Sequence, residues 1–102
     1  MDRDHVIATL RAYEPEFRAA GVLSMSLFGS VARGEALAGS DIDLAVRLGA
    51  GFSHGGFDYF GRLDELEKRL SQLLSSKVDV VEEPVRKERL QKEIDKDRVF
   101  AF

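Results

Sequence analysis

One stretch, residues 27–46, constrains this chain more than any other part of it, with the sequence LFGSVARGEALAGSDIDLAV. It combines a Gly-Ser turn, a short helical segment, a loop and two carboxylates one residue apart. Residues 24–28 end in an apolar run, which predicts a buried strand that stops at Gly29. Because Gly29 has no Cβ, the backbone can turn sharply there and a ligand can approach it closely.

Ser30 follows this glycine and can cap a helical turn formed by residues 31–33. Free backbone N–H groups at the start of a helix favour an anion. Gly34 suits the end of that turn, and residues 35–40 are typical of a loop that leads into the next strand. The segment therefore predicts an anion-binding turn between two strands.

Two carboxylates, Asp41 and Asp43, begin the next predicted strand, residues 41–46. Side chains alternate along a strand, so both carboxylates point to the same side. At about 4 Å and an effective dielectric constant near 20, two like charges repel by roughly 4 kcal/mol. A divalent cation would offset this repulsion, and Mg²⁺ prefers carboxylate oxygens together with water and substrate phosphates. An Asp pair beside an anion-binding turn therefore predicts a site for a metal and a nucleotide.

The stretch contains the motifs Gly29-Ser30, Ala32-Arg33-Gly34 and Asp41-Ile42-Asp43. Together they resemble the GSxARG…DxD signature of the polymerase-beta-like nucleotidyltransferase superfamily, and most strongly that of its minimal, single-domain branch. The signature covers about a fifth of the chain, and the order of the predicted elements fits nearly all of it. The resemblance implies a nucleotidyltransferase fold in which Gly29 and Ser30 hold phosphates and both aspartates bind metal.

A third carboxylate, Asp79, lies in the segment 77–82, KVDVVE, whose β-branched residues predict a second strand. On its own, such a carboxylate either faces water at a sheet edge or belongs to a site. The superfamily pattern has a third carboxylate on a later neighbouring strand, so the resemblance implies that role for Asp79. An antiparallel neighbour would bring it to the face of the DxD pair. Glu82 is the alternative, although its place at the strand end fits a loop better.

The remaining segments predict helices around these strands. An amphipathic pattern predicts a helix over residues 2–20, which Pro15 breaks or kinks. Residues 57–74 form the clearest amphipathic helix. A highly charged surface helix follows Pro84, and residues 98–102 predict an edge strand or a tail that packs on a partner. The predicted fold class is α+β, a small mixed sheet flanked by helices.

Length and composition limit the possible functions. A chain of 102 residues predicts a single domain, residues 1–102, that is too small for a separate substrate domain. No apolar run is long enough to cross a bilayer and the polar start has no signal-peptide core, which predicts a cytoplasmic chain without a membrane partner. The net charge of -3 gives no overall attraction to nucleic acid, so direct nucleic-acid binding is not expected.

Other ligand motifs are weak. The chain has no cysteine and two histidines, neither of which has a partner at metal-ligand spacing. One of them, His54, lies in the glycine-rich segment 48–56, where a polar loop residue is the simpler interpretation. This segment lacks both common phosphate-loop patterns, which favours a plain connection over a nucleotide-binding loop.

By the resemblance, the chain transfers AMP from ATP with two Mg²⁺ ions held by Asp41, Asp43 and Asp79. Proteins of the minimal branch are commonly antitoxins that attach AMP to a tyrosine of a HEPN-domain toxin. Arg33 either stabilises phosphate charge or forms a salt bridge that orients the motif loop. Two alternatives stay open: a non-catalytic module that neutralises its partner by contact, and a nucleotidyltransferase acting on a small molecule.

Overall fold

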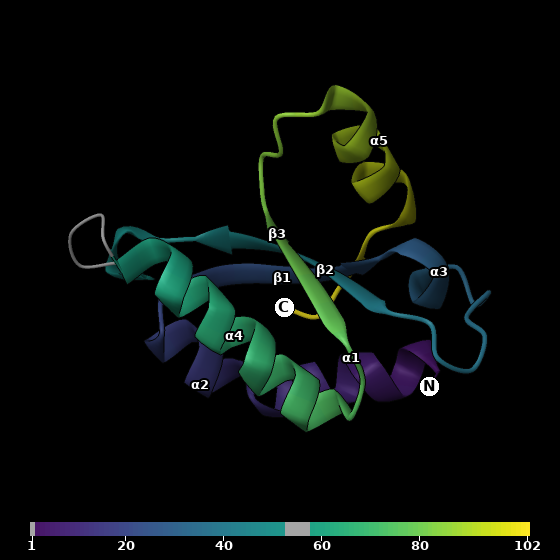
Figure 1. Cartoon of the computed structure of the whole chain (residues 1–102), viewed down its shortest axis with the longest axis horizontal. Coiled ribbons are helices and arrows are strands. Elements are labelled where there is room, and N and C mark those ends of the chain that lie inside the picture. Colours follow the sequence, from purple (N-terminus) through teal and green to yellow (C-terminus); the bar gives the residue numbers. More distant parts are fainter. Residues whose placement is uncertain (1, 53–57) are drawn as a thin grey trace.

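A four-stranded sheet in the order β3-β2-β1-β4 forms the centre of the computed structural model, which describes residues 2–52 and 58–102 (Figure 1). β1 (Val22–Phe28) pairs antiparallel with β2 (Ile42–Leu48) and with the short β4 (Val99–Phe100). β3 (Val78–Glu82) pairs parallel with β2. The predicted mixed sheet is confirmed, and so is the edge strand at the end of the chain.

The parallel pairing of β2 with β3 corrects our expectation that this neighbour is antiparallel. The connection between them contains α4 (Tyr59–Leu74), a helix of 16 residues and therefore about 24 Å long. Such a helix carries the chain back along the sheet, so β3 starts at the same end as β2. The register of the parallel pair aligns Asp43 with Asp79.

The helices lie in two unequal layers (Figure 1). α1 (Arg3–Ala12), α2 (Glu14–Ala19) and α4 cover one face of the sheet, and α5 (Glu88–Asp97) lies against the other. The predicted break at Pro15 is confirmed, because this proline occupies the first turn of α2, where its missing N–H costs nothing. No helix within the described ranges is long and apolar enough to cross a membrane.

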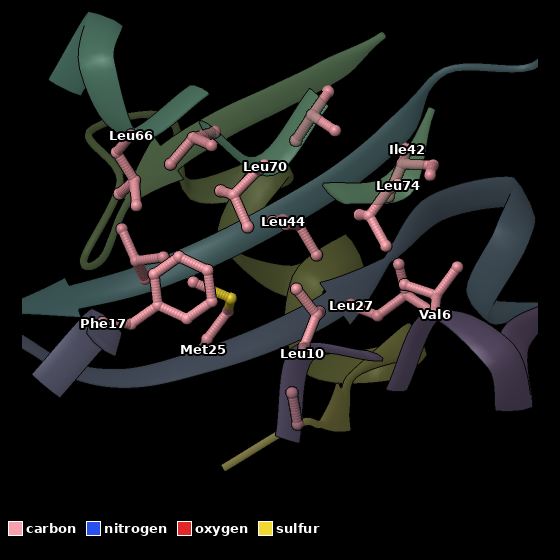
Figure 2. Packing of buried hydrophobic residues seen from close by; sticks show 14 of the residues in the cluster. Val6, Leu10, Phe17, Met25, Leu27, Ile42, Leu44, Leu66, Leu70 and Leu74 are labelled. Carbon is pink, nitrogen blue, oxygen red and sulfur yellow. The ribbon is translucent and has the colours of Figure 1, made fainter. Parts of the chain in front are cut away.

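The main core lies between the sheet and the layer of three helices (Figure 2). Its large fully buried side chains come from both layers: Val6, Leu10, Phe17, Val22, Met25, Leu27, Ile42, Leu44, Val46, Leu70 and Leu74. A smaller cluster on the opposite face contains Phe28, Ala45 and Ile94 of α5. Because side chains alternate along each strand, the residues between the main-core positions face the side of α5.

The glycine-rich segment begins with a short 3-10 turn, η1 (Ala50–Phe52). Phe52 is buried in the main core, which ties this end of the connection to the helical layer. The rest of the predicted loop, including His54, lies outside the described residues.

A buried ion pair anchors α5 to the sheet. The side chain of Glu83 is fully buried and accepts hydrogen bonds from Arg98 at 2.5 and 2.9 Å and from Nε2 of Gln91 at 2.8 Å. Burial alone would raise the pKa of Glu83, but the hydrogen bonds from Arg98 and Gln91 outweigh it and hold this pKa below its usual 4.5. Glu83 is therefore a carboxylate that the fold keeps ionised.

We expect Arg98→Met to lower the free energy of unfolding by about 3 kcal/mol or more, because it removes the guanidinium that pairs directly with the buried Glu83 charge. The double variant Glu83→Met/Arg98→Met should recover most of this loss, since neither buried charge then remains. Urea denaturation of the wild type, both single variants and the double variant measures the coupling. If the losses in the free energy of unfolding of the two single variants simply add in the double variant, Glu83 and Arg98 do not form a coupled ion pair.

The same pair predicts how stability depends on pH. Because the folded-state pKa of Glu83 lies below its ordinary value, its stabilisation is present above about pH 4.5 and is lost as pH falls through the folded pKa. Urea titrations repeated from pH 6 downward should therefore show a smaller acid-side loss of stability in the double variant than in the wild type.

Candidate active site

Asp43 and Asp79 lie side by side on adjacent strands, because the register of β2 and β3 pairs their Cα positions. In each strand the residues immediately before and after the aspartate are buried in the main core, so both carboxylates belong to the opposite face. Asp43 is half-buried and Asp79 is exposed at the edge of the sheet. The structure thus brings together two of the three carboxylates that the sequence indicated.

Asp41 precedes β2 instead of starting it. Its carboxylate lies 3.7 Å from Nζ of Lys77; the Lys77 side chain is largely exposed and the Asp41 side chain is partly exposed. Within residues 2–52 and 58–102, no three acidic or histidine side chains converge in a ready-made metal cluster. Asp41 therefore lies near Asp43 and Asp79, but its carboxylate pairs with Lys77 and does not complete a metal cluster with them.

The charge distribution around Asp43 is unfavourable without a cation. Burial raises the pKa of Asp43, and the negative charges of Asp79 and Asp41 raise it further, whereas Arg33 opposes them. Mg²⁺ is commonly held by one or two carboxylates together with water and substrate phosphates. The oxygen donors at this position therefore fit Mg²⁺, with the remaining ligands left to water and to a phosphate group.

The Gly-Ser turn lies directly beside Asp43, because the antiparallel register pairs Phe28 with Asp43. Gly29 has φ +79°, and a Cβ at this position would collide with Oδ2 of Asp43. The sequence predicted that a ligand comes close to Gly29, and the structure places the Asp43 carboxylate at this position. Only glycine combines this backbone angle with that contact.

Ser30 does not cap the following helix, contrary to our expectation. α3 (Gly29–Ala32) begins one residue earlier, with Phe28 in the N-cap position, so Ser30 already lies inside the helical turn. Neither its hydroxyl nor its backbone N–H makes a hydrogen bond to any part of the chain that the structure describes. Both groups can therefore donate to a ligand. Gly34 ends the turn with φ +72°, as predicted.

A cleft of about 460 Å³ opens beside Asp43, between α3, α5 and the sheet. Its lining residues are Phe28, Gly29, Ser30, Arg33, Asp43, Val81, Leu90, Glu93 and Asp97. The predicted phosphate-binding residues and Asp43 thus share one cleft. Asp79 does not line it but lines a separate shallow hollow between α4 and β3 that also contains Lys77.

One wall of the cleft comes from α5, for which the sequence pattern predicted only a charged surface helix. Leu90, Glu93 and Asp97 lie at positions i, i+3 and i+7 and so share one side of this helix. That spacing was visible in the sequence. The sequence does not indicate that this side of α5 faces the Gly-Ser turn. The contact between α3 and α5 depends on the packing of the whole sheet.

Arg33 forms the salt bridges that one of our two interpretations anticipated. Its Nη1 donates to Oδ2 of Asp97 at 2.7 Å, and its Nε lies 3.2 Å from Oε1 of Glu35. Both hydrogen bonds raise the pKa of Arg33, and the bond to Asp97 has the larger effect. Arg33 nevertheless lines the cleft, so a role toward phosphate is compatible with the salt bridges.

Glu82, the alternative third carboxylate, is aligned with Val46 and not with Asp43. Its Oε1 accepts a hydrogen bond from the hydroxyl of Tyr59. Burial, together with this bond, raises the pKa of Tyr59 to about 12. Glu82 is thus hydrogen-bonded to Tyr59 at the far end of β3, and Asp79 is the carboxylate of β3 that is aligned with Asp43.

Comparison with known proteins identifies the class to which this fold and site belong. The family described as nucleotidyltransferase domain matches residues 10–101, and the chain belongs to this family. A protein of Methanocaldococcus jannaschii, named as an inferred protein adenylyltransferase, is 34% identical over 81 residues, which make up 78% of this chain and 77% of that protein.

Solved structures narrow the class to a minimal nucleotidyltransferase domain. One, named as an inferred minimal nucleotidyltransferase, has a TM-score of 0.76 and 30% identity and covers 97% of this chain and 95% of its own. A second contains the MNT antitoxin of Shewanella oneidensis with a tri-AMPylated HEPN toxin, with a TM-score of 0.64, 20% identity and coverage of 93% and 70%. At that identity, the second likeness concerns the fold alone.

We expect Gly29→Ala to impair Mg²⁺ and nucleotide binding, because its Cβ displaces the Asp43 carboxylate. Gly34→Ala is a matched control: its φ is also positive, but a Cβ there meets nothing within 4 Å. Both variants should lose about 1–2 kcal/mol of stability from backbone strain. Calorimetric titration with Mg²⁺ and ATP should show weaker binding only for Gly29→Ala, and equal binding by both variants would place the phosphate site elsewhere.

We expect Asp43→Asn to stabilise the metal-free protein, because it removes a half-buried charge that faces Asp79 and Asp41. A gain of about 1 kcal/mol corresponds to a rise in Tm of about 4–8 °C for a domain of this size. Mg²⁺ should raise the Tm of the wild type and leave that of Asp43→Asn unchanged in thermal scans. Glu65→Gln, at an exposed carboxylate of α4, controls for net charge; an equal response by both variants would refute the metal assignment.

Proposed function

We propose that this chain is a Mg²⁺-dependent protein adenylyltransferase that transfers AMP from ATP to a tyrosine of a HEPN-type partner protein and so acts as its antitoxin. The alignment of Asp43 with Asp79 beside the Gly29-Ser30 turn carries the proposal. The relative named for protein adenylylation and the fold shared with an MNT antitoxin support it. A cytoplasmic location, where ATP is available, is part of the same proposal.

Each predicted site residue has a role in this transfer. Asp41 and Asp43 would hold two Mg²⁺ ions, with Asp79 completing the second site, and Gly29 and Ser30 would bind the departing phosphates. The metal ions, when bound, neutralise the triphosphate and favour the ionised form of the attacking hydroxyl. The tyrosine oxygen bonds to the α-phosphorus, the bond to the β-phosphate oxygen breaks, and pyrophosphate leaves. Asp79 would help to take up the proton of the hydroxyl.

The exposure of Asp79 favours a protein as the acceptor. A small acceptor is normally held in an enclosed pocket that orients its hydroxyl, and orientation supplies a large part of the rate enhancement. Asp79 instead lies exposed on the edge strand β3, where a partner protein can approach. The surface of that partner would supply the orientation. A protein acceptor is therefore favoured over a small-molecule acceptor.

We expect the purified chain, with ATP and Mg²⁺, to add one or more AMP groups to the HEPN-type protein encoded beside it. A helical protein with an Arg-x4-His-x-Tyr segment is the partner to test. Intact-mass measurement of that protein reads out the addition. Asp79→Asn should abolish the mass gain because the proton acceptor and metal ligand is lost, while co-elution in size-exclusion chromatography persists.

The non-catalytic alternative makes the opposite prediction for the same mixture. Full neutralisation of the partner by the wild-type chain without any mass gain would refute the enzymatic proposal and support binding alone. Neutralisation that depends on ATP, Mg²⁺ and Asp79 would refute the binding-module alternative.

A further inference from the structure

We infer that Asp97, in the last turn of α5, is a positioning residue that holds Arg33 ready to bind the triphosphate of ATP. The inference rests on the proposed function and extends it to a carboxylate far from the motif in sequence. Arg33 is the C-cap residue of α3, and 64 positions separate it from Asp97. The pair connects the phosphate-binding turn directly to α5.

The hydrogen bonds of Arg33 leave one part of its guanidinium group for a ligand. Nη1 donates to Asp97 at 2.7 Å, and Nε donates to Glu35 at 3.2 Å. Nη2 makes no hydrogen bond with the residues that the structure describes. Because the guanidinium is planar and rigid, fixing two of its nitrogens fixes the direction of the third. Arg33 lines the same cleft as Gly29 and Ser30, where the phosphates are expected.

Burial shows which member of the pair is fixed and which can reach a ligand. The Asp97 side chain is only 8% exposed, whereas that of Arg33 is 44% exposed. The nearly buried Asp97 carboxylate is thus a well-ordered hydrogen-bond acceptor for Arg33, whose side chain remains accessible from the cleft. Holding a long side chain in its binding geometry in advance reduces the entropy lost when the ligand binds.

Electrostatics argues against any direct contact of Asp97 with ATP. A carboxylate in a cleft for a triphosphate repels the ligand, and a negative charge near a helix C-terminus is also unfavourable to the helix. Asp97 lines the cleft and lies at the C-terminal end of α5, so its charge is unfavourable both for a bound triphosphate and for the helix. Its bond to Arg33 is the contact through which it can favour ATP.

The neighbouring ion pair on α5 offers a matched control. Asp95 lies in the same last turn and pairs with Arg98 at 3.0 Å, and neither residue lines the cleft. Asp95→Asn and Asp97→Asn therefore each remove one negative charge and one arginine partner from the same helix end. Only the second change affects an arginine that faces the cleft.

Calorimetric titration with ATP in Mg²⁺ tests the inference on the folded full-length chain. Relative to the wild type, we expect Asp97→Asn to bind about two- to tenfold more weakly, Asp95→Asn to bind equally well, and Arg33→Met to bind about tenfold or more weakly. In the Arg33→Met background, Asp97→Asn should cause no further loss and a small gain, because only its repulsion of phosphate remains. Glu35→Gln is a second variant with a smaller loss expected, since Glu35 is more exposed than Asp97.

Three results would overturn the inference: equal affinities for Asp97→Asn and Asp95→Asn, tighter binding by Asp97→Asn while Arg33 is present, or an undiminished loss in the Arg33→Met background. In each of these cases the wild type still binds Mg²⁺ and ATP, so the proposed function stands. A folded wild-type chain that binds no ATP would instead refute the proposed function and the inference with it. Thermal unfolding of every variant establishes that each one is folded.

Discussion

The hydrogen bonds of β2 with its two neighbours determine where the site can lie. Antiparallel pairing with β1 brings Asp43 opposite Phe28, and so beside the Gly29 turn, while parallel pairing with β3 brings Asp79 alongside. A shift of one residue in either register would turn these carboxylates toward the main core. The buried positions on either side of Asp43 prevent such a shift, because they must stay in that core. The apolar core thus sets the geometry of a polar site on the opposite face.

α5 forms the opposite wall of the cleft with little apolar area of its own. Ile94 is its one fully buried apolar side chain within the described residues, and Leu90 packs partly buried beside it. Two ion pairs complete the attachment, Glu83 with Arg98 and Asp97 with Arg33. Buried ion pairs add little net stability compared with apolar packing, but they require defined partners and directions. This wall is therefore positioned by specific contacts, at a place where directed polar groups are useful for binding an anion.

The cleft concentrates negative charge where an anionic substrate is proposed to bind. Glu93 and Asp97 line it together with Asp43, and Arg33 is the cation among its lining residues. In the absence of metal, burial and the nearby charges of Asp79 and Asp41 raise the pKa of Asp43, which costs stability. Functional sites often retain such unfavourable local interactions because ligand binding relieves them. Mg²⁺ and a correctly held Arg33 together supply the positive charge that a triphosphate needs.

The sequence by itself determined the features that depend on short-range patterns. The glycine turn, the carboxylates one residue apart, the break at Pro15, the long amphipathic helix and the individual strands each follow from neighbours within one short segment. Tertiary structure decided the parallel direction of β3, the pairing of Asp41 with Lys77, the cleft wall from α5 and the partner of Arg33. These depend on contacts such as Arg33 with Asp97, 64 positions apart, where no local periodicity encodes a partner. Such contacts arise only when the core closes, because the burial of apolar side chains, and not the polar groups themselves, brings the distant segments together.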